Sequence, residues 1–177
     1  MGELFLRGTR WGIDKGLLTP GIAGRISAAV YSALPPSPAD IVKPGGTPPL
    51  FAIASGTRDG RPGTVAVARR RDDDLVRLVS EGKRVEVRLG DISREASLGW
   101  ASYAAGVGWA AARDGLDAPG LDIAFAADVP RGAGLSSSAS LSCSTASAWN
   151  DLAGWGLERP AIARLGRLAE NEIAGAP

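Results

Sequence analysis

The most informative run of the sequence reads Pro130-Arg131-Gly132-Ala133-Gly134-Leu135-Ser136-Ser137-Ser138-Ala139-Ser140-Leu141. Before it, Leu121, Ile123 and Phe125 alternate with Asp122 and Ala124, which predicts a β-strand. After it, the alanine-rich stretch 139–152 is suited to a helix. We therefore expect the run to be a loop that leads from a strand into a helix.

A loop of this composition at the start of a helix is suited to binding phosphate. Gly132 and Gly134 let the backbone approach a ligand, and the first helical N–H groups are unpaired and carry the positive end of the helix dipole. Serine hydroxyls can donate to phosphate oxygens or ligate a hard cation, so a magnesium nucleotide is the natural occupant. The run is neither a P-loop nor G-x-G-x-x-G. Glycine and serine content alone would favour a flexible connector. The interpretation as a phosphate-binding loop therefore depends on the order of the residues.

Upstream of the run, the sequence predicts a small sheet and a helix. Residues 64–68 and 75–79 read as strands joined by the charged turn 69–74, and alternation over 85–89 predicts a third strand. We expect these three strands to form an antiparallel meander. The three arginines and three aspartates of the turn suggest either an anion or metal site or a solvated hairpin end, and we favour the hairpin end. Residues 100–113 predict a helix whose aromatic side chains pack in the core: Trp100, Tyr103 and Trp109.

Composition narrows the function classes. The 177 residues are 45% hydrophobic and 22% charged, as in an ordinary globular domain. A net charge of +1 without a basic stripe argues against a nucleic-acid partner. The chain has no histidine, which excludes histidine catalysis and histidine metal ligands, and its single cysteine, Cys143, excludes an internal disulfide. Neither an export signal nor a membrane helix is visible, so we expect a cytoplasmic protein.

The first part of the chain, residues 1–63, is poorly patterned. Eight of the twelve prolines fall between Pro20 and Pro62 and interrupt every apolar period. We interpret residues 1–63 as degenerate or partly disordered, with apolar patches at 26–34 and 50–54 that could form a helix turn or a strand. The patterned domain is expected to span residues 64–177.

The central run resembles the second GHMP motif in its galactokinase form, Asp-Val-Pro-Arg-Gly-Ala-Gly-Leu-Ser-Ser-Ser-Ala-Ser-Leu, here residues 128–141. The resemblance covers roughly residues 64–177 and includes Gly99-Trp100-Ala101-Ser102-Tyr103, Ala105-Gly106-Val107, Asn150-Asp151-Leu152 and Ala169-Glu170-Asn171-Glu172. It implies the amino-terminal, ATP-binding domain of a GHMP kinase. That domain is an α+β fold like domain 2 of ribosomal protein S5, a small and mostly antiparallel sheet packed with helices.

The resemblance also implies a site. In galactokinases this loop covers the ATP phosphates, a role that transfers to Gly132, Ala133, Gly134, Leu135, Ser136, Ser137 and Ser138. The family's magnesium ligands match Ser138 and Glu170, so the implied cofactors are ATP and Mg²⁺. The implied reaction is transfer of the γ-phosphoryl group to the 1-hydroxyl of galactose. One departure lies inside the match, because galactokinases usually carry glutamate where this chain has Ser142.

Other family features are missing from the sequence. The family's catalytic aspartate, in Gly-Ile-Met-Asp-Gln, would lie beyond Pro177, and the sugar-binding segment with the family's arginine is not identifiable. We therefore expect no catalytic residue, and a truncated, inactive fragment that binds MgATP at most. Two alternatives stay open: a non-catalytic nucleotide or sugar sensor, and a truncated gene product without function. The expected partners are small molecules, ATP and galactose by resemblance, with neither nucleic acid nor membrane, and we expect a monomer.

Overall fold

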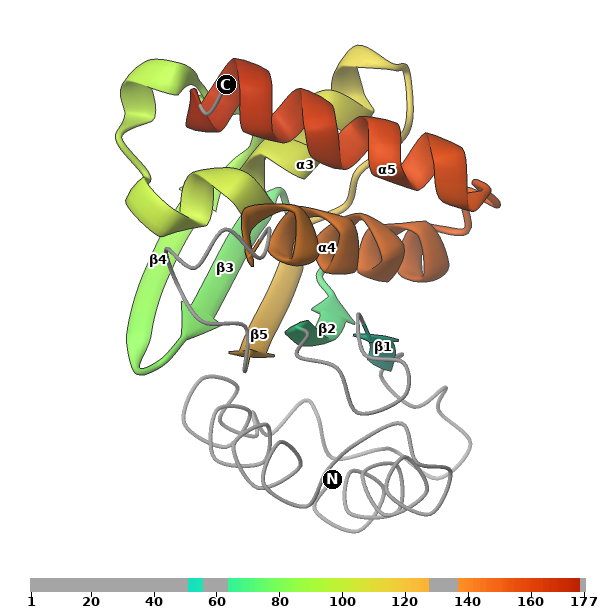
Figure 1. The fold of residues 1–177 in the computed structure, drawn as a ribbon, viewed down its shortest axis with the longest axis horizontal. Coiled ribbons are helices and arrows are strands. Elements are labelled where there is room, and N and C mark those ends of the chain that lie inside the picture. Colours follow the sequence, from blue (N-terminus) through green and yellow to red (C-terminus); the bar gives the residue numbers. More distant parts are fainter. Residues whose placement is uncertain (1–50, 56–63, 128–136, 176–177) are drawn as a thin grey trace, which may run out of the picture.

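The described part of the chain, residues 51–55, 64–127 and 137–175 of a computed structural model, is a sheet with helices packed on one face (Figure 1). The strands are β1 (Phe51–Ser55), β2 (Thr64–Arg70), β3 (Leu75–Ser80), β4 (Lys83–Arg88) and β5 (Leu121–Ala127). The α-helices are α3 (Ser102–Arg113), α4 (Ser137–Ala153) and α5 (Arg159–Leu168), and α5 continues into the π-helical turn η5 (Ala169–Ala174). Three short 3₁₀ turns join β4 to α3: η2 (Leu89–Asp91), η3 (Arg94–Ala96) and η4 (Gly99–Ala101). The expected α+β class is confirmed.

The strands follow the spatial order β1-β2-β5-β3-β4. The pairs β1–β2, β2–β5 and β3–β4 are antiparallel, and β3–β5 is parallel, so the sheet is mostly antiparallel as predicted. The predicted meander is wrong in one respect, because β5 lies between β2 and β3 and pairs with both. β1 lies ahead of residue 64, inside the poorly patterned region. It coincides with the apolar patch 50–54, for which the sequence allowed either a helix turn or a strand.

The connection from β2 to β3 crosses the start of β5, which explains why β2 and β3 do not pair. The N–H of Arg71 donates to the carbonyl of Gly120 at 2.9 Å, and the N–H of Gly120 donates to the carbonyl of Asp73 at 2.8 Å. A Cβ at position 120 would lie 2.4 Å from that carbonyl oxygen, closer than any real contact. Glycine at this position therefore lets β5 enter the sheet beneath the connection.

The core lies between the sheet and the helical layer. Leu121, Ile123 and Phe125 of β5 are buried in it, as their alternation predicts. Trp149 of α4 has no exposed surface, and its indole N–H donates to the carbonyl of Pro119 at 2.9 Å. A Cβ at Gly108 of α3 would lie 2.9 Å from the Trp149 ring. The missing side chain thus makes room for the indole at the contact between α3 and α4.

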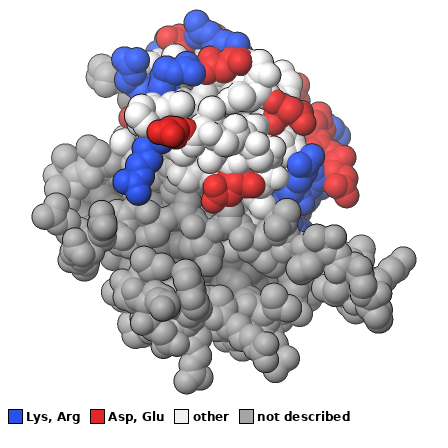
Figure 2. All heavy atoms as spheres, turned by 90° about the vertical axis from the view of Figure 1, so that its right-hand side faces the viewer, with Lys and Arg blue, Asp and Glu red and all other residues white. Residues whose placement is uncertain are grey.

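The charged side chains of the described surface carry both signs. On the face shown in Figure 2, acidic and basic groups are interspersed around a mainly uncharged area. That face therefore has no extended field of one sign. In the described ranges, no helix combines the length and the apolar character needed to cross a bilayer.

Candidate functional site

Two side chains from distant parts of the sequence meet where α4 begins. The hydroxyl of Ser138 donates to Oε2 of Glu170 at 3.1 Å, across a separation of 32 residues. Ser138 lies in the first turn of α4, and Glu170 lies in η5 at the end of α5. The structure therefore brings together the two residues that the resemblance matches to magnesium ligands.

The packing of α5 against α4 explains this meeting. Gly166 of α5 faces Ser142 and Cys143 of α4, and a Cβ added to it would lie 3.3 Å from both Ser142 Cβ and Cys143 Sγ. One helical turn is 3.6 residues, so the next turn of α5 carries Glu170 to the level of Ser138, because the two helices run in opposite directions. Close approach at a glycine thus places the carboxylate beside the first turn of α4.

A cavity of about 350 Å³ opens beside the same turn. Its apolar walls include Trp100, Tyr103, Phe125 and Leu141, and Ser137 and Ser138 lie at its edge, together with Thr64, Ser80, Glu81 and Ala127. Trp100 packs edge-on against Phe125, with ring centroids 6.3 Å apart. The sequence favoured a packing role for Trp100 and Tyr103, and the structure shows that both also line this cavity. The sequence did contain a signal for this, because residues three apart in a helix lie on the same face and can therefore line the same cavity.

Most of the predicted phosphate loop lies outside the described residues. Gly132, Ala133, Gly134, Leu135 and Ser136 belong to that part, so the structure places only Ser137 and Ser138 of the set. These two serines begin α4, whose first turn contains no acidic side chain. Ser137 and Ser138 also line the cavity, so the start of this 17-residue helix faces the site with the positive end of its dipole.

The donor set near Glu170 suits a hard cation that also takes ligands from a bound anion. Among the described residues, no group of three or more histidine, cysteine, aspartate and glutamate side chains could hold a metal ion by itself. Magnesium needs no such group, because it keeps several waters and typically takes one or two carboxylates together with phosphate oxygens. Burial, and secondly the charge of Glu170, raise the pKa of the nearby Cys143 thiol, so it stays protonated at neutral pH.

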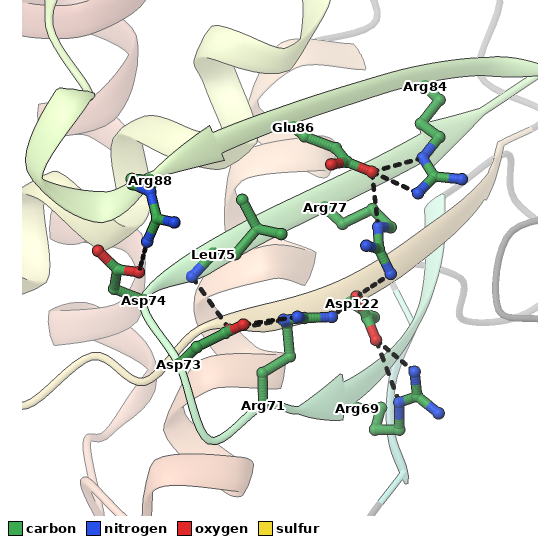
Figure 3. A network of polar contacts seen from close by, with 10 residues as sticks. All are labelled: Arg69, Arg71, Asp73, Asp74, Leu75, Arg77, Arg84, Glu86, Arg88 and Asp122. Atoms are coloured by element: carbon green, nitrogen blue, oxygen red, sulfur yellow. Dashed lines mark hydrogen bonds and ion pairs between the residues drawn. The ribbon is translucent and has the colours of Figure 1, made fainter. Parts of the chain in front are cut away.

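A second cluster of charges lies at the opposite end of β5 and takes no part in this site (Figure 3). Asp122 has no exposed surface and accepts hydrogen bonds from three arginines: Arg69 at 3.1 Å, Arg71 at 2.9 Å and Arg77 at 3.2 Å. The expectation of a solvated hairpin end at residues 69–74 is thereby corrected, since two of its arginines bind a buried carboxylate. Asp73 of the same turn is exposed, and a hydrogen bond from Arg71 lowers its pKa to about 2.

The chain is similar to GHMP kinases in sequence. Residues 102–177 match the family described as GHMP kinases N terminal domain. A galactokinase of Streptomyces coelicolor is 43% identical over 116 residues, which cover 64% of this chain and 30% of the relative. A galactokinase of Enterococcus faecalis is 36% identical over 119 residues with the same coverage. The chain spans about 30% of the length of the curated relatives that it matches.

Solved structures show the same similarity. The crystal structure of Lactococcus lactis galactokinase complexed with galactose matches with a TM-score of 0.61 and 29% identity, over 66% of this chain and 31% of that one. Mevalonate kinase of Methanococcus jannaschii matches with a TM-score of 0.55 and 23% identity, over 64% of this chain and 38% of that one. The second match supports the fold alone.

Proposed function

Since the chain carries a GHMP kinase amino-terminal domain related to galactokinases, we propose that it binds MgATP at the start of α4. The observation that carries this proposal is the contact between Ser138 and Glu170, which places a carboxylate and a hydroxyl beside a helix N-terminus and an apolar cavity. A carboxylate at that position would repel a triphosphate that carries no magnesium. When magnesium is bound, the same carboxylate would ligate the ion and so help to hold the nucleotide.

Each part of the nucleotide has a matching part of the proposed site. The loop 132–138 and the first N–H groups of α4 would hold the phosphates. Ser138 and Glu170 would hold the magnesium ion, which neutralises charge on the phosphate oxygens. The cavity is within the usual size of small-molecule sites, and Trp100 and Tyr103 offer aromatic surface to the nucleotide base.

The reaction that we propose this domain serves is the phosphorylation of galactose to galactose 1-phosphate. Two of the relatives reported above are galactokinases, and the Lactococcus lactis structure is complexed with galactose. Phosphoryl transfer also needs a group that orients or deprotonates the sugar hydroxyl. The 177 residues contain no counterpart of the family's Gly-Ile-Met-Asp-Gln string. For these residues by themselves we therefore propose nucleotide binding without sugar phosphorylation.

A thermal melt of the chain with ATP, in magnesium buffer and in EDTA, tests this proposal. At a concentration 100 times its Kd, a ligand stabilises a protein by about 2.7 kcal/mol, which should raise the melting temperature by several degrees. Glu170→Gln should lose most of the magnesium-dependent part of the shift. Glu172→Gln, which changes an exposed glutamate of the same turn, should behave like wild type.

Three results would contradict the proposal or a part of it. The absence of any shift with MgATP in the wild-type chain would refute nucleotide binding. Release of ADP in the presence of galactose, at a rate that depends on the chain, would refute the restriction to binding. An equal loss of the shift in both glutamine variants would remove Glu170 from the magnesium site.

A further inference from the structure

A second serine, Ser142, touches the carboxylate of Glu170 and has no role in the site described above. Its hydroxyl lies 3.4 Å from Oε1 of Glu170, whereas the hydroxyl of Ser138 lies 3.1 Å from Oε2. The two serines therefore face different oxygens of one carboxylate. Ser142 has no exposed surface, so water cannot readily take its place.

The single proton of the Ser142 hydroxyl has two acceptors within reach. One is the carbonyl of Ser138 at 3.0 Å, which lies one helical turn earlier and is also the usual acceptor of the backbone N–H of residue 142. The other is the carboxylate of Glu170. It is the more distant acceptor, but it is charged, and hydrogen bonds to charged acceptors are roughly twice as strong as neutral ones. Both acceptors keep Ser142 turned toward the start of α4.

A metal-ligand role for Ser138 makes Ser142 more important. A hydroxyl that ligates a cation points a lone pair at the cation. With magnesium between them, the Ser138 hydroxyl can therefore no longer donate its hydrogen bond to Glu170. Among the described residues, Ser142 is then the hydroxyl that still reaches the carboxylate. Held at Oε1, the carboxylate keeps Oε2 turned toward Ser138.

We propose that Ser142 is a positioning residue, which holds Glu170 in the orientation that binds magnesium. This inference rests on the proposed binding of MgATP. It gives a role to the position where the chain departs from the glutamate usual in galactokinases. A serine there supplies a donor to Glu170 without adding a second negative charge beside it.

The test compares ATP affinity in magnesium buffer and in EDTA by titration calorimetry on the full chain. Ser142→Ala should weaken binding about three- to tenfold in magnesium, the range that one hydrogen bond supplies, and leave binding in EDTA unchanged. Ser144→Ala is the matched control, because Ser144 is also buried in α4 and its hydroxyl donates to the carbonyl of Leu141 at 2.9 Å. This control should equal wild type in both buffers. A purely structural role for Ser142 would weaken binding equally in both.

The outcomes separate this inference from the proposed function. If wild type binds ATP more tightly with magnesium and Ser142→Ala does so to the same degree, the inference is overturned and the proposed function stands. If wild type binds ATP in neither buffer, both are overturned. Should the alanine variant fail to fold, Ser142→Cys still fills the space of the hydroxyl but donates only weakly, and it should show the same selective loss. An unchanged magnesium effect in the cysteine variant would also overturn the inference.

Discussion

Replacing Asp122 by asparagine should destabilise the chain far more than its single altered atom suggests. The carboxylate has no exposed surface and pairs with Arg69, Arg71 and Arg77, whose side chains are 16 to 20% exposed. Removing one partner of a buried ion pair costs about 3 to 5 kcal/mol, because the remaining charge stays without compensation. Partial exposure of the arginines lets water relieve part of that cost, and Arg71 and Arg77 keep a second acidic partner each, Asp73 and Glu86. We therefore expect a loss near the lower end, about 3 kcal/mol.

Asp73→Asn is the matched control, because Asp73 also binds Arg71 but is 47% exposed. An exposed ion pair is worth less than about 1 kcal/mol, so this variant should lose no more than that. Urea denaturation of both variants measures the free energy of unfolding, and an unchanged slope with denaturant would show that the unfolding reaction is the same. Equal losses in the two variants would refute the idea that burial makes Asp122 important.

Three further predictions concern packing, pH and the thiol. Gly108→Ala should cost up to about 2 kcal/mol, because overpacking against Trp149 costs about 1 to 3 kcal/mol and better helix propensity returns about 1 kcal/mol; a higher melting temperature would contradict this. The hydrogen bond from Arg71 lowers the pKa of Asp73 to about 2 in the folded chain, below its ordinary value of about 4. The stability that Asp73 contributes is therefore complete above pH 4 and is lost as the pH falls toward 2. Asp73→Asn should make the unfolding free energy depend less on pH in this range, and an identical dependence in the variant and in wild type would contradict the prediction. Burial raises the pKa of Cys143, so a disulfide reagent at pH 8 should label the native chain much more slowly than the chain in urea, and equal rates would show that the thiol is freely accessible.

Much of the local structure could be predicted from neighbouring residues. Alternation identified β4 and β5, and apolar runs on either side of a charged turn identified β2 and β3, all to within about two residues; alanine-rich composition identified α3 and α4. The pairing of Ser138 with Glu170 came from resemblance to a family motif, since nothing within either segment points to the other. The aromatic cavity was missed because helical spacing alone does not distinguish a packed tryptophan from one that lines a cavity.

The local sequence thus determined whether a well-patterned segment forms a helix or a strand, because the residues that share one face of either element are set by their spacing along the chain. The position of β5 between β2 and β3, the burial of Asp122 under three arginines and the approach of Glu170 to α4 all depend on residues far apart in sequence. The first and the last are made possible by close packing at a glycine: Gly120 under the β2–β3 connection, and Gly166 against Ser142 and Cys143. Such contacts arise only when the folded chain brings distant surfaces together, so tertiary structure alone decided them.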